Sequence, residues 1–164
     1  MSRAVLSLGS NLGDRLEHLR LAVRGLSDVL VAASSVYETE PWGVVEQPEF
    51  LNAVVVVDSA DVDEWGWLRR GQALEQQARR RREQRWGPRT LDVDVVTVDG
   101  VRSDHADLLL PHPGTPHRAS VLVPWCAVDP AAVLPGHGRI ADLLAALPES
   151  ERATVHLRES LTLR

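Results

Sequence analysis

Two aspartates, Asp92 and Asp94, lie two residues apart in a segment that is typical of a β-strand. Alternate residues of a strand point to the same face, so both carboxylates project together, with their Cα atoms roughly 7 Å apart. Two carboxylates on one side repel each other unless water or a cation lies between them, and hard oxygen ligands at this distance suit Mg²⁺. A solvated strand face with two ordinary aspartates stays open as the alternative interpretation.

A cluster of arginines directly precedes these aspartates, and its members are Arg79, Arg80, Arg81, Arg82, Arg85 and Arg89. All eighteen basic residues of the chain are arginines. This excludes Walker P-loop proteins, protein kinases and Schiff-base enzymes, because each of these classes needs a lysine. Guanidinium groups match phosphate oxygens in pairs, although a basic helix end could also complement the helix dipole. Beside two potential Mg²⁺ ligands, the cluster favours a metal–triphosphate site and phosphoryl transfer.

Two further segments carry groups suited to binding. Phe50 and Asn52 share one face of a predicted strand, where a flat heteroaromatic could stack on the ring while the amide pairs with its edge. An ordinary strand start is the alternative. The loop of residues 111–118 contains two histidines but no evident third nitrogen or sulfur ligand for a metal. We expect His112 or Arg118 to donate to a phosphate instead.

The composition limits the class of protein. The chain has 164 residues, of which 44% are apolar and 25% charged, and a formal net charge of −5. This length suits one domain over residues 1–164. No apolar run approaches the roughly 20 residues of a membrane span, and the N-terminus lacks a signal-peptide pattern. We therefore expect a cytoplasmic protein without a membrane partner. The one cysteine excludes internal disulfides and multi-cysteine metal sites.

Hydrophobic periodicity predicts the elements that position these residues. Strands are predicted at 3–8, 31–38, 50–58 and 91–98, with one helix after Asp14 and a second from Asp61 or Asp63 to about Arg82. This βαββαβ order is typical of an α+β, ferredoxin-like antiparallel sheet with helices on one face. Beyond Val101 the many prolines predict a loop-rich C-terminal extension, with short helices near Arg118 and over residues 140–147.

Five landmarks follow one another along the chain. They are Leu8 to Gly13, Tyr37 to Thr39, Gln47 to Asn52, Arg85 to Asp94, and Pro111-His112 with Arg118. With these landmarks the chain resembles the 6-hydroxymethyl-7,8-dihydropterin pyrophosphokinase family, and the run at 85–94 is the most specific of them. The resemblance implies that the pterin hydroxymethyl oxygen attacks the β-phosphorus of ATP, giving AMP and the pterin diphosphate in folate biosynthesis.

The resemblance also implies roles for individual residues. Two Mg²⁺ ions would be held by Asp92 and Asp94. The triphosphate would be stabilised by Arg80, Arg82 and Arg89, the first two on a mobile loop, and these three arginines and the two aspartates would form the catalytic set. ATP would be contacted by Gln72, Glu75, Arg85, Trp86, Val95, His112 and Arg118. The pterin would be surrounded by Thr39, Glu40, Trp42, Phe50, Asn52 and Asp92. We expect a monomer that binds these small molecules and no nucleic acid.

Two positions depart from the family pattern. Ser120 stands where the family usually places a second aromatic against the pterin, and Arg79 stands where a loop glycine is usual.

Two other function classes fit the same element order. A single-stranded nucleic-acid binder would need surface aromatics on the central strands and a basic sheet face. Asp92, Asp94 and the negative net charge disfavour it. A ligand-binding domain without catalysis is the second alternative, and the presence of both aspartates and the arginine cluster disfavours that one.

Overall fold

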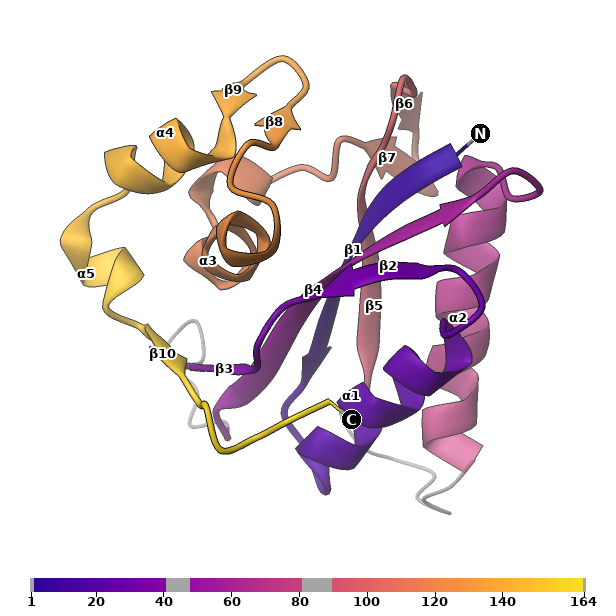
Figure 1. Ribbon diagram of the computed structural model, residues 1–164, viewed down its shortest axis with the longest axis horizontal. Coiled ribbons are helices and arrows are strands. Elements are labelled where there is room, and N and C mark those ends of the chain that lie inside the picture. Colours follow the sequence, from indigo (N-terminus) through magenta and orange to yellow (C-terminus); the bar gives the residue numbers. More distant parts are fainter. Residues whose placement is uncertain (1, 41–47, 81–89, 164) are drawn as a thin grey trace.

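The computed structural model describes residues 2–40, 48–80 and 90–163, and for Arg80 the backbone alone. At its centre lies a six-stranded antiparallel sheet in the order β10–β3–β4–β1–β5, in which β2 also pairs with β4 (Figure 1). Its strands are β1 (Ser2–Ser10), β2 (Leu30–Ala33), β3 (Tyr37–Thr39), β4 (Phe50–Ser59), β5 (Asp92–Val98) and β10 (Val155–Leu157). The architecture is a mixed α/β fold with an antiparallel sheet.

Two helices, α1 (Arg15–Gly25) and α2 (Glu64–Arg80), cover one face of this sheet (Figure 1). Alternate apolar residues of the strands, such as Leu6 and Val93, form one core with buried helix residues such as Leu19 and Trp67. The predicted N-cap of α1 is confirmed, because an Asp14 carboxylate oxygen accepts a hydrogen bond from the Glu17 backbone N–H at 3.1 Å. For α2, Asp63 accepts in the same way from the Gly66 N–H at 2.7 Å.

The opposite face carries a second core. Val5, Val54 and Val96 pack there against Leu122 and Trp125 of α3 (Ala119–Val128). The prediction of helices on one face alone was therefore too narrow, because the strands are apolar on both faces along part of their length. Helix α4 (Ile140–Ala146) packs on α3, and Figure 1 shows both helices on the side away from α1 and α2.

The C-terminal third is more regular than the predicted loop-rich extension. Besides α3, α4 and β10 it contains a hairpin, a two-stranded ribbon and two short helices. These are β6 (Ser103–His105) with β7 (Leu108–Leu110), β8 (Val133–Leu134) with β9 (Gly138–Arg139), the 3₁₀ helix η1 (Thr115–His117) and α5 (Glu149–Arg152). Across residues 2–40, 48–80 and 90–163, no helix combines the length and the apolar character needed to cross a bilayer.

The strands predicted over residues 3–8 and 31–38 differ most from the structure. Strand β1 continues to Ser10, because β4 pairs with it up to the Ser10–Leu51 position. The single strand predicted over residues 31–38 is two strands, β2 and β3, both paired with β4. The interruption lies at Ser34, whose hydroxyl accepts the Val54 N–H at 2.9 Å in place of a backbone partner.

A cluster of charges ties three parts of the chain together around Glu38 of β3. Arg15, at the start of α1, contacts one Glu38 carboxylate oxygen at 2.8 Å, and Arg158, beyond β10, contacts the other at 3.3 Å. Burial alone would raise the pKa of Glu38, but the hydrogen bond from Arg15 and the two positive charges outweigh it and lower the pKa. We call Arg15, Glu38 and Arg158 the Glu38 cluster.

We predict that Glu38→Gln destabilises the protein at neutral pH and much less in acid. A lowered folded-state pKa means that the carboxylate stabilises the fold fully above its usual pKa of 4.5, and that this contribution is lost as the pH falls through the lowered value. Urea unfolding of both proteins from pH 7 to pH 3 measures the difference. Glu17→Gln, which removes an exposed ion pair with Arg24, should cost less than about 1 kcal/mol. An undiminished effect of Glu38→Gln at pH 3 would contradict the prediction.

Candidate active site

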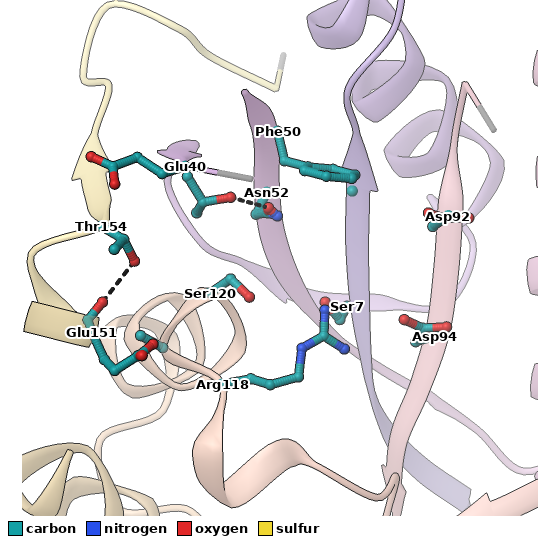
Figure 2. A pocket seen from close by; sticks show the side chains of 13 residues that line it. Ser7, Glu40, Phe50, Asn52, Asp92, Asp94, Arg118, Ser120, Glu151 and Thr154 are labelled. Carbon is teal, nitrogen blue, oxygen red and sulfur yellow. Dashed lines mark hydrogen bonds between the residues drawn. The ribbon is translucent and has the colours of Figure 1, made fainter. Parts of the chain in front are cut away.

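A cavity of about 480 Å³ opens on the second face of the sheet, beside the start of α3. Its lining comes from β1, β3, β4, β5, the start of α3 and the C-terminal segment, and consists of Ser7, Gly9, Thr39, Glu40, Phe50, Asn52, Asp92, Asp94, Arg118, Ala119, Ser120, Glu151 and Thr154. Figure 2 shows Asp92 and Asp94 on one side of the cavity and Glu40, Glu151 and Thr154 on the other. We call it the first cavity.

The two aspartates occupy the face that the sequence predicted. Pairing with β1 places Asp92 opposite Gly9 and Asp94 opposite Ser7. Val93, between the two aspartates, points to the other face and is buried there. Both carboxylates are half-buried, and the Arg118 guanidinium extends across the cavity toward Asp94 and Ser7 (Figure 2). Negative and positive groups therefore face each other over an accessible space.

A flat binding surface lies at the other end of the same cavity. The Thr39 hydroxyl donates to the Asn52 side-chain oxygen at 3.2 Å, and both residues are buried. This bond fixes the Asn52 amide at the cavity wall. Gly9 forms the floor, because a methyl group added there would lie 3.7 Å from Asn52 Nδ2 and 3.8 Å from Phe50 Cδ1. The phenyl ring and the amide can therefore both reach a planar molecule.

A second cavity of about 190 Å³ lies at the edge of β5. It is lined by Leu68, Val93, Asp94, Val95, Ala106, Asp107, Leu108, Leu109, His112 and Pro113. A register shift in β5 leaves Val96 without a paired residue on β1, and its carbonyl accepts the His112 N–H at 2.8 Å. This bulge thus anchors the loop that carries His112. Asp94 lines both cavities, so they adjoin each other at this residue.

The donors around Asp92 and Asp94 fit a magnesium ion. Two half-buried carboxylates on one strand face supply hard oxygen ligands. Within residues 2–40, 48–80 and 90–163, no three His, Cys, Asp or Glu side chains gather as a metal-binding group. Mg²⁺ is commonly held by one or two carboxylates, with water and substrate phosphates completing its shell. A pair of aspartates beside open space satisfies this requirement.

The structure brings together most of the described residues that the sequence selected. Thr39, Glu40, Phe50, Asn52, Asp92, Asp94 and Arg118 line the first cavity, and Val95 and His112 line the second. Trp42, Arg82, Arg85, Trp86 and Arg89 lie outside the described residues.

Three predicted residues are placed differently. Gln72 is exposed on α2 and lines neither cavity. Glu75 accepts the Val93 N–H at 3.0 Å, which ties α2 to β5. Arg80, expected on a loop, is the last residue of α2, since the helical periodicity of the sequence continues that far.

Sequence reasoning missed five residues that line the first cavity, namely Ser7, Gly9, Ala119, Glu151 and Thr154. Ser7 and Gly9 could have been found, because they alternate with the buried apolar residues Leu6 and Leu8 of β1. Glu151 and Thr154 give no such signal, since Glu151 lies in the four-residue helix α5 and Thr154 directly precedes the three-residue strand β10.

The comparisons with known proteins agree with one another. The model of the family described as 7,8-dihydro-6-hydroxymethylpterin-pyrophosphokinase matches residues 5–130. A relative from Mycobacterium tuberculosis, named 2-amino-4-hydroxy-6-hydroxymethyldihydropteridine pyrophosphokinase, is 48% identical over 96% of this chain and 90% of its own length. A relative of the same name from Mycobacterium leprae is 50% identical over 100% of this chain and 92% of its own.

Solved structures are similar in fold. The crystal structure of Plasmodium falciparum HPPK-DHPS wild type with pteroate matches 88% of this chain with a TM-score of 0.69 and 14% sequence identity. The match spans 44% of that longer chain. At this identity the likeness concerns the fold alone.

Proposed function

The chain belongs to the 7,8-dihydro-6-hydroxymethylpterin-pyrophosphokinase family, and we propose that the first cavity holds the pterin and the second ATP, on either side of Asp94. It transfers pyrophosphate from ATP to 6-hydroxymethyl-7,8-dihydropterin in folate biosynthesis, giving AMP and the pterin diphosphate. The observation that carries the assignment of the two sites is the sharing of Asp94 by both cavities.

The pterin ring occupies the first cavity. Phe50 stacks against one face of the ring, and Asn52, held by Thr39, pairs with its donor–acceptor edge. Ser120 lies at this cavity in place of a second aromatic. Among the described residues that line the cavity, Phe50 therefore supplies the stacking. The hydroxymethyl group points toward Asp92 and Asp94.

The nucleoside part of ATP occupies the second cavity, where Val95 and His112 contact it. The phosphates extend past Asp94 into the first cavity, and the Arg118 guanidinium donates to their oxygens. The hydroxymethyl oxygen bonds to the β-phosphorus and releases its proton to solvent. The bond from the β-phosphorus to the α,β-bridging oxygen breaks, and AMP leaves with that oxygen. The chain contributes mostly alignment of the two oxygens and neutralisation of charge.

We propose that Asp92 and Asp94 hold Mg²⁺, two ions in accordance with the family resemblance. When bound, Mg²⁺ neutralises negative charge that develops on the phosphate oxygens. Arg80, Arg82 and Arg89 remain proposed triphosphate contacts. Gln72, Glu75, Arg85 and Trp86 remain proposed ATP contacts, and Trp42 a proposed pterin contact.

Several wider assignments stay proposals. The order β5–β1–β4–β3 among the four strand regions predicted from the sequence supports a ferredoxin-like arrangement. A single domain over residues 1–164, a monomeric state and a cytoplasmic location are predictions from length, composition and resemblance.

Product analysis tests the proposed chemistry. Purified protein is mixed with ATP, Mg²⁺ and reduced 6-hydroxymethylpterin, and the adenine nucleotides are separated by chromatography. We expect AMP in amounts equal to the pterin diphosphate, and no pterin-dependent ADP. Formation of ADP would mean attack at the γ-phosphorus and would overturn the proposed alignment.

We predict that Asp92→Asn and Asp94→Asn each reduce turnover by at least about 100-fold, the scale on which one preorganised polar group acts at a reacting centre. Both variants should keep the far-ultraviolet circular dichroism of the parent and need more Mg²⁺ for ATP binding in calorimetric titrations. Asp104→Asn, at an exposed strand position outside both cavities, is the matched control. Activity like the parent's at limiting Mg²⁺ would rule out the metal assignment.

We also predict that Gly9→Ala weakens pterin binding while leaving the fold intact. The added methyl meets its neighbours at ordinary contact distances, yet it occupies the cavity floor under the ring. The KM for the pterin should rise about 2- to 10-fold, the equivalent of one aromatic contact, with the KM for ATP unchanged. Steady-state kinetics and thermal melting measure both effects, and an unchanged pterin KM would show that the ring lies elsewhere.

A further inference from the structure

The C-terminal segment, by which we mean residues 149–163, forms one wall of the first cavity. Glu151 and Thr154 line it, on the side opposite Asp92 and Asp94 (Figure 2). Both residues lie beyond residue 130, where the match to the family model ends. The Thr154 hydroxyl donates to the Glu151 carbonyl oxygen at 2.7 Å, which holds the turn between α5 and β10 in shape. The wall is therefore an ordered structure of its own.

This wall is attached directly to the residues proposed to bind the pterin. Strand β10 pairs with β3, with Val155 opposite Thr39. Immediately beyond that pair, the Glu40 N–H donates to the Thr154 carbonyl oxygen at 3.1 Å. Strand β3 has three residues, and it is held between β4 and β10. The position of Thr39, and through its hydroxyl that of the Asn52 amide, depends on both neighbours.

Contacts beyond β10 lock the segment in place. Arg158 donates its backbone N–H to the Val36 carbonyl oxygen at 2.9 Å, and its guanidinium pairs with Glu38 at 3.3 Å. Farther on, the Thr162 carbonyl oxygen accepts from the Arg20 side chain at 2.8 Å, and Leu163 is buried in the core of the first face. Glu38 and Thr39 are adjacent, so the contacts of Arg158 hold the chain directly beside a residue proposed to bind the pterin.

We propose that the C-terminal segment is a working part of the pterin site, in which Arg158 is a positioning residue and Thr154 a wall residue that sets how tightly the pterin is held. This inference rests on the proposed function. It adds a binding element that the family motifs do not contain. The segment touches β3 and lines the first cavity on the side opposite Asp92 and Asp94, away from the proposed phosphate positions, and it does not line the second cavity. Its effect therefore falls on the pterin and not on ATP.

The first test removes the ion pair between Arg158 and Glu38. Arg158→Gln keeps a polar side chain but shortens it and removes its charge, so the ion pair with Glu38 is lost. We expect the KM for the pterin to rise about two- to fivefold, the size of one partly exposed ion pair, with the KM for ATP and the kcat at saturating pterin unchanged. Arg158→Lys should restore most of the affinity. Arg152→Gln, on exposed α5 outside the cavity, is the matched control and should behave like the parent.

The second test changes the wall itself. Thr154→Leu places a larger apolar side chain at the cavity and removes the hydrogen bond to Glu151. The pterin KM should rise again, without a change for ATP. Binding of the pterin in the presence of an unreactive ATP analogue, followed by fluorescence, gives the same quantity without turnover.

The outcomes separate the two proposals. A parent protein that binds pterin but forms no AMP would contradict the proposed reaction and leave the wall testable by fluorescence. An active parent with unchanged pterin KM in both Arg158→Gln and Thr154→Leu would overturn the inference alone. Equal losses for pterin and ATP, or the same loss in Arg152→Gln, would also overturn it, because they would indicate a general loss of structure.

Discussion

The structure depends on the alternation of side chains along three neighbouring strands, β4, β1 and β5. On one face their residues are apolar and meet α1 and α2. On the other face the same strands change character along their length. Val5, Val54 and Val96 lie under α3, while Ser7, Asn52 and Asp94 lie toward the other end and line the first cavity. A polar half-face cannot be covered by an apolar helix at low cost, so it stays open as a site.

A single extra residue links the two halves of that site. The β-bulge at Val96 lets two consecutive residues of β5 depart from strict alternation, and it frees a carbonyl oxygen that binds the His112 backbone. The loop with His112 is thereby fixed beside Asp94, at the edge of the sheet. Its position on the edge strand β5, rather than any special chemistry, makes Asp94 common to both cavities.

Much of this arrangement could be predicted from local patterns. The two-residue spacing of Asp92 and Asp94, and of Phe50 and Asn52, placed each pair on one face, and all four residues line the first cavity. The single strand predicted over residues 31–38 was wrong, because the sequence gives no sign that the Ser34 hydroxyl replaces a backbone partner. The wall at Glu151 and Thr154 could not be predicted either, since pairing between distant short strands leaves no local period.

The pairing of β10 with β3 also has a consequence for how the molecule folds. The two strands come from opposite parts of the sequence, so closing the loop between them costs entropy before any contact compensates. Pairings of this kind tend to form after the contacts that are local in sequence. The sheet and its two aspartates can thus assemble while one side of the cavity is still open. Binding competence would then be acquired in the final step of folding, and cleavage within the last residues would leave a compact protein without a complete pterin site.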